Sequence, residues 1–193
     1  MQIFSPKTPD GSLVGQLLVA TPLIQESCFA RSVVYMCSHN AEGAMGMIIN
    51  YPIENVAMGD ILEQLDIESQ IKLVDFPIHF GGPVEPTRGF VVHSSDYITE
   101  QSIIDQNGVV VTANVSILQE LAKGKGPEQG MLVLGYAGWT AGQLETEVET
   151  GSWIVVPASK KLVFETDNEL KWSVAVATLG FDVGHYSPTV GHA

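Results

Sequence analysis

Positively charged residues are scarce in this sequence. Its 193 residues include 9 lysines and arginines against 22 aspartates and glutamates, which gives a formal net charge of −13. A nucleic-acid-binding surface normally carries a stripe of basic side chains against the phosphates. The densest basic groupings here are Lys123 with Lys125 and Lys160 with Lys161. Direct binding to nucleic acid is therefore disfavoured.

Cysteine pairs, metal-ligand spacings and long apolar runs are also missing. The two cysteines, Cys28 and Cys37, form no CxxC or Cys/His pattern, and Cys37 is expected to be a small buried residue. No apolar run approaches the roughly 20 residues of a membrane span. The first ten residues lack the basic segment that opens a signal peptide. These absences predict a cytoplasmic protein with no membrane span, no metal site and no cofactor.

Complete catalytic motifs are absent too. There is no GxSxG nucleophile elbow, no P-loop and no GxGxxG loop that opens a helix. His93 precedes the Ser94–Asp96 run, but adjacent strand residues point to opposite faces and do not by themselves assemble a triad. His39, His79 and His93 are isolated in the sequence, so they are interpreted as structural histidines rather than metal ligands.

What the sequence does contain is a large apolar fraction. Hydrophobic residues make up 45% of the chain and charged residues only 16%, which indicates extensive buried sheet or an apolar contact surface. The length predicts one domain, residues 1–193, with residues 1–12 as a loose N-terminal arm and 184–193 as a disordered tail. The expected strands and helices mix irregularly rather than alternating, which favours the α+β class.

Hydrophobic periodicity and turn residues delimit the expected elements. Strands are expected at 16–20, 31–38, 45–50, 78–82, 89–93, 109–112, 131–136 and 153–156, and helices at 55–65, from 114 or 116 to before 124, at 140–150 and at 168–179. Both faces of the 31–38 segment are apolar, so this strand is expected in the centre of the sheet.

Two loops offer polar candidates for a binding site. In the hairpin turn after residue 38, His39 and Asn40 either project from a binding loop or satisfy turn geometry. At the end of the 78–82 strand, the amides of Gly81 and Gly82 could bind an anion, with Arg88 as a bidentate partner. The alternative for the two glycines is a bend at the end of a strand.

A third candidate lies where the 131–136 strand meets the next helix. Thr140 and Gln143 fit a capping box, and Trp139 precedes them. Trp139 and Gln143 could face a ligand or partner at the helix N-terminus, or Trp139 could pack as core. The glutamates of this helix, Glu145 and Glu147 among them, are expected on an exposed acidic face.

Several motifs, in order along the chain, resemble the AlgH/YqgE family of bacterial proteins. They are Arg31-Ser32-Val33-Val34-Tyr35, Cys37-Ser38-His39-Asn40, Gly43-Ala44-Met45-Gly46, Gly81-Gly82-Pro83-Val84, Arg88-Gly89-Phe90-Val91-Val92-His93, Leu134-Gly135-Tyr136-Ala137-Gly138-Trp139 and Gly142-Gln143-Leu144-Glu145, followed by Trp153 and Trp172. The resemblance spans roughly residues 17–183. It implies an α+β domain with a bent mixed β-sheet, partly barrel-like and surrounded by helices. Family names point to regulation of exopolysaccharide genes, and the resemblance brings no catalytic residues, cofactor or substrate.

These observations leave two main functional hypotheses. The first is a non-enzymatic regulatory or adaptor domain that binds another protein through a surface near His39, Gly82, Arg88 and Trp139. The alternative is an enzyme or binding protein for a small anionic metabolite, with Arg88 binding the charge and His93 or His39 as general base. Direct DNA binding is a third hypothesis, which the net charge disfavours.

Overall fold

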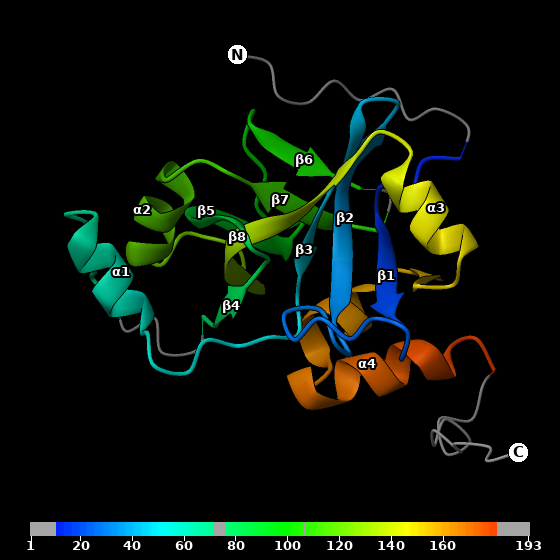
Figure 1. Ribbon diagram of the computed structural model, residues 1–193. Helices are drawn as coiled ribbons and strands as arrows, with labels where there is room; N and C mark the ends of the chain where they lie inside the picture. The colour runs from blue at the N-terminus through cyan, green and yellow to red at the C-terminus, as the bar shows by residue number, and fades with distance from the viewer. Residues whose placement is uncertain (1–10, 72–75, 106, 181–193) are drawn as a thin grey trace, which may run out of the picture.

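In the part of the chain that the structure describes, nine strands form one sheet that curls on itself, with helices packed around it (Figure 1). The computed structural model describes residues 11–71, 76–105 and 107–180. The strands are β1 (Gln16–Ala20), β2 (Val33–Asn40), β3 (Gly43–Ile48), β4 (Ile78–Phe80), β5 (Val84–Ser94), β6 (Ser102–Ile104), β7 (Val109–Thr112), β8 (Gly130–Thr140) and β9 (Trp153–Pro157). The helices are α1 (Met58–Gln64), α2 (Ser116–Ala122), α3 (Gln143–Glu149) and α4 (Asn168–Ala177), with a π-helical turn, η1 (Lys161–Glu165), before α4.

Strand β8 organises the sheet. The spatial order is β6-β7-β5-β8-β3-β2-β1-β9, and β4 pairs with β8 beside β3. The β4–β8 pair is parallel and the other pairs are antiparallel, so the sheet is mixed. Strand β2 lies between β1 and β3 with both faces buried, which confirms the central strand expected at 31–38. The α+β class with a bent mixed sheet is confirmed.

Side chains link the two ends of the curled sheet. In the turn between β6 and β7, Asn107 Nδ2 donates to the Gly15 carbonyl just before β1, at 3.0 Å. Lys160, which follows β9, donates from Nζ to Ser95 Oγ after β5, at 3.4 Å. These contacts join segments at opposite ends of the strand order, as expected for a sheet that is partly barrel-like.

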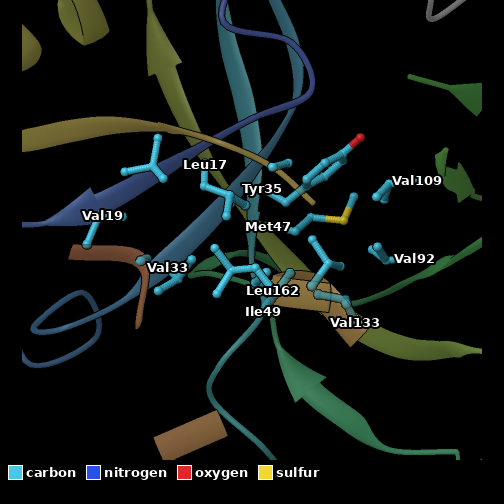
Figure 2. Close-up of a cluster of buried hydrophobic side chains, with 14 of the residues drawn as sticks. Leu17, Val19, Val33, Tyr35, Met47, Ile49, Val92, Val109, Val133 and Leu162 are labelled. Carbon is cyan, nitrogen blue, oxygen red and sulfur yellow. The ribbon is translucent and has the colours of Figure 1, made fainter. Parts of the chain in front are cut away.

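The core forms because alternate strand residues face opposite sides of the sheet. In β1, Leu17 and Val19 belong to the cluster shown in Figure 2, whereas Leu18 and Ala20 belong to a second cluster on the other face. Figure 2 shows side chains from β1, β2, β3, β5, β7 and β8 pointing toward one another inside the curl. Each fully buried aliphatic side chain contributes about 1.5–3 kcal/mol relative to exposure.

Different helices pack on different clusters. Helix α4 adds Trp172, Ala175 and Val176 to the cluster that contains Leu17 and Val19. Trp172 Nε1 donates to the Ala20 carbonyl at 2.8 Å. Helix α3 places Leu144 in the second cluster. Helices α1 and α2 pack on a third cluster beside β5 and β8 (Figure 1).

Most expected elements are present, with shifted ends. Strands β5 and β8 are each 11 residues long, longer than their apolar runs indicated, because both continue past bulges with exposed residues. The three-residue strand β6 was not predicted. Cys37 is buried at a bulge between Met36 and Ser38, as expected for a small core residue, and burial raises its pKa to about 12.

Two further expectations concern the ends of the chain and the membrane. The tail at 184–193, and the arm at 1–12 apart from Gly11 and Ser12, lie outside the described residues. Across residues 11–71, 76–105 and 107–180, none of the helices has the length and apolarity needed to cross a bilayer.

Candidate functional site

Three of the eight candidate residues, His39, Trp139 and Gln143, gather around helix α3. The register places His39 opposite Ala44 and Ala44 opposite Trp139, so these strands bring the two side chains to the same end of the sheet. His39 Nε2 lies 3.0 Å from Glu145 Oε1, and Leu13 N–H donates to His39 Nδ1 at 3.1 Å. Because Nδ1 accepts, the ring proton is on Nε2 and is donated to Glu145. Both ring nitrogens of His39 are therefore engaged within the protein.

Trp139 belongs to a clamp centred on Glu147. The indole N–H groups of Trp139 and Trp153 both donate to Glu147 Oε2 at 2.8 Å, and the two rings meet edge to face. Gln143 Nε2 donates to the other oxygen of Glu147 at 2.9 Å, while its own Oε1 accepts from Thr140 N–H. The expectation that Glu147 lies on an exposed face is wrong, because these donors hold it half-buried.

Asn40 completes the hairpin rather than reaching α3. Its Oδ1 accepts the Glu42 N–H at 2.8 Å, and Asn40 pairs with Gly43 across a two-residue turn. Such a side-chain contact two residues ahead is the usual contribution of Asn to a turn. In α3, the pKa of Glu145 is lowered by its own backbone amide and by the hydrogen bond from His39.

The glycine pair packs directly against β8. Gly81 N–H donates to Leu134 O at 2.7 Å, and Gly81 O accepts Ile48 N–H at 2.9 Å. A Cβ atom on Gly82 would lie 2.2 Å from the carbonyl carbon of Tyr136. The Gly81 amide is thus used in backbone pairing, and Gly82 allows two chain segments to touch.

Arg88 and His93 do not form a joint site. Both lie on β5, five residues apart, so they project from opposite faces and their backbones are separated by about 17 Å. Arg88 pairs with Glu85 at 3.0 Å and stacks over Phe90. His93 is fully buried, with Nδ1 on the Ser94 carbonyl and Nε2 on Thr112 Oγ1, each at 2.9 Å. Burial lowers the pKa of His93, so the ring is neutral.

The structure reveals a pocket that the sequence did not indicate. It has a volume of about 210 Å3 and lies between β4, the start of β8, η1 and the N-terminus of α4. Its walls are formed by Pro77, His79, Gly130, Met131, Phe164, Glu165, Thr166, Asp167, Asn168 and Lys171. None of the eight predicted site residues lines it. A π-helical turn in the wall is itself notable, because such turns occur frequently at functional sites.

Three polar side chains form a hydrogen-bonded set in this pocket. Lys171 is 3% exposed, and its Nζ donates to the Ile49 carbonyl at 3.1 Å and to Asn168 Oδ1 at 2.8 Å. His79 is 1% exposed, and its Nε2 lies 3.1 Å from the same Asn168 oxygen. Burial lowers the pKa of Lys171 to about 8 and that of His79 to about 4. At neutral pH the pocket therefore holds a lysine ammonium beside a neutral imidazole.

One sequence signal could have pointed to this pocket. Lys171 sits at i−4 from Ala175 and next to Trp172, on the apolar stripe of the predicted 168–179 helix. A lysine on an apolar stripe is either a snorkelling surface residue or a buried cation, and periodicity does not separate the two. His79 and Asn168 are 89 residues apart, so their contact leaves no local pattern in the sequence.

The curled mixed sheet with helices packed around it places this protein in the α+β class. The AlgH-like family model matches residues 17–184, and the chain belongs to this family. It is 42% identical to a UPF0301 protein of Azorhizobium caulinodans, with 99% of this chain and 97% of the relative covered. It is 45% identical to a UPF0301 protein of Nitrobacter hamburgensis, covering 96% and 90%.

Solved structures agree with this assignment. The solution structure of the AlgH protein from Pseudomonas aeruginosa superimposes with a TM-score of 0.76 at 34% identity, with both chains covered in full. A crystal structure of a protein from Corynebacterium diphtheriae has a TM-score of 0.61 at 24% identity over 77% of each chain, and shares the fold. The resemblance found in the motifs is confirmed.

Proposed function

We propose that this protein is a non-catalytic regulatory domain of the bacterial cytoplasm that binds a small anionic ligand in the pocket of His79, Asn168 and Lys171. The observation that carries the proposal is the state of Lys171. Its ammonium is buried, and both partners that the structure gives it are neutral oxygens. A buried charge is costly unless it is compensated, so an anion bound beside Lys171 would be strongly favoured.

The regulatory part of the proposal rests on the family and on charge. The motifs resemble a family whose names refer to regulation of exopolysaccharide genes. With a net charge of −13, the chain would act on transcription through a protein partner rather than by contacting DNA. The small-molecule alternative from the sequence is kept in modified form, with Lys171 in place of Arg88 as the group that binds charge.

The binding claim is tested by titrating the full chain with sodium acetate, sodium propionate and inorganic phosphate, using calorimetry and backbone amide NMR shifts. We expect wild-type binding with shifts at His79 and Asn168, and at least a tenfold loss of affinity in Lys171→Met. Lys123→Met removes the same charge from an exposed site and should bind like the wild type. An unchanged affinity in Lys171→Met, or no binding by the wild type, would contradict the proposal.

The same titration has a predicted pH dependence. Two titratable groups face Lys171: Asp167, the N-cap of α4, whose charge favours the charged lysine, and His79 on β4. Because the pKa of Lys171 is about 8, the ammonium is present at pH 7 and lost progressively above pH 8. Affinity for acetate should therefore fall between pH 7 and pH 9. A flat profile over this range would show that another group binds the anion.

A further inference from the structure

The hydrogen bonds in the pocket fix where its protons are. A lysine side chain only donates, so Asn168 must turn its oxygen rather than its nitrogen toward Lys171. The same oxygen faces His79 Nε2, which therefore carries the ring proton. His79 Nδ1 is left as an unprotonated acceptor, and it has no hydrogen-bond partner among the residues that the structure describes. The pocket thus contains a cationic donor, and the His79 ring in its wall keeps a buried acceptor nitrogen without a partner in the described residues.

The N-terminus of α4 adds to the attraction for an anion. This ten-residue helix begins at Asn168, with Asp167 as N-cap, and both residues line the pocket. The first-turn amides and the helix dipole favour negative charge at this end. Together with Lys171, they describe a site for an anionic group.

The exposed side of the pocket carries negative charge, opposite to the positive charge of Lys171. Glu165 and Asp167 line it and are both exposed, whereas Lys171 is buried. These two carboxylates at the pocket entrance repel a multiply charged anion such as phosphate. They favour a ligand whose cationic group lies next to its anionic group, because each charge then meets its opposite.

Resting on the proposed function, we infer that the pocket selects a small zwitterion of the α-amino acid class. Its carboxylate lies at Lys171 and the α4 amides, and its ammonium lies toward Asp167 and Glu165. A pocket of about 210 Å3 is smaller than the roughly 300–1,000 Å3 of pockets that hold drug-sized ligands, so it suits a ligand with a small side chain.

Three probes with the same carbon skeleton test this inference by calorimetry on the full chain: alanine, lactate and propionate. They carry an ammonium, a hydroxyl and a hydrogen on the α-carbon. We expect alanine to bind at least tenfold more tightly than propionate, with lactate between them, and inorganic phosphate to bind more weakly than alanine. If propionate binds as tightly as alanine, the zwitterion inference is wrong and the anion site stands. If no probe binds, both fail.

Asp167→Asn provides the matched variant. Asparagine is as good an N-cap as aspartate, so α4 should be preserved, while the negative charge beside the ligand ammonium is lost. The preference for alanine over propionate should drop at least threefold, and propionate should bind as well as or better than before. An unchanged preference in Asp167→Asn and in Glu165→Gln would overturn the placement of the ammonium.

Discussion

At Gly82 the corner between β4 and β5 lies so close to β8 that a side chain would overlap the backbone. The residue has φ of +149°, and an added Cβ would meet three backbone atoms of Tyr136 and Ala137 within 2.5 Å. The sequence indicated a special backbone at Gly81 and Gly82 but could not show what approaches them. That partner is 54 residues further along the chain, in a strand whose register is set by the whole sheet.

Gly82→Ala should therefore destabilise the protein. Backbone strain alone costs about 1–3 kcal/mol, and the overlap with Tyr136 adds to it. Gly59→Ala is the control, since nothing lies within 4 Å of its added Cβ and it sits inside α1. That change should raise the free energy of unfolding by about 0.5–1 kcal/mol. Urea unfolding of both variants measures the difference, and equal stabilities would refute the close approach.

At the scale of an element, α3 is a short helix held mainly by polar contacts. It buries one side chain fully, Leu144, and is attached to the sheet through Glu145 and Glu147. The helix was predictable from its local pattern, and Gln143 does accept the Thr140 N–H, but the predicted capping box is wrong because the N-cap is Gly142 and no side chain caps the helix. The clamp was not predictable, since it needs Trp153 from the next strand beside Trp139 and periodicity assigned Glu147 to the exposed face.

Glu147→Gln should weaken this attachment. A neutral amide oxygen replaces the carboxylate oxygen shared by the two indoles, and the amide nitrogen cannot accept from Gln143. We expect a loss of about 1–3 kcal/mol in unfolding free energy, with a change in tryptophan fluorescence. Glu149→Gln removes an exposed charge from the same helix and should leave both measurements near the wild type. Similar behaviour of the two variants would argue against the clamp.

At the scale of the whole molecule, the sequence predicts individual strands and helices but not which distant residues meet in space. A short apolar run such as Leu17–Ala20, which Thr21 and Pro22 follow, indicates a strand because the signal is local. The pocket, in contrast, depends on Lys171 reaching the Ile49 carbonyl, 122 residues away, and on His79 meeting Asn168. Arg88 and His93 were grouped by closeness in sequence, yet an odd spacing on one strand separates them.

The net charge of −13 is also a property of the whole molecule. Repulsion among surface carboxylates opposes the compact state, and salt screens it. Raising NaCl from about 20 mM to about 500 mM at pH 7.5 should increase the free energy of unfolding, because the Debye length shrinks several-fold. The increase should be much smaller near the sequence pI of about 4.6, which serves as the control. An equal effect at both pH values would assign it to something other than charge.

The contacts between the two ends of the strand order affect whether another copy of this protein can add a strand to its sheet edges. An open sheet normally exposes two edges on which a foreign strand can add. Here the terminal strands β6 and β9 are three and five residues long, β9 finishes in Pro157, and Asn107 and Lys160 tie their neighbouring turns across the gap. Such edges offer a poor template, so this sheet should resist growing into intermolecular β-structure despite its apolar strands.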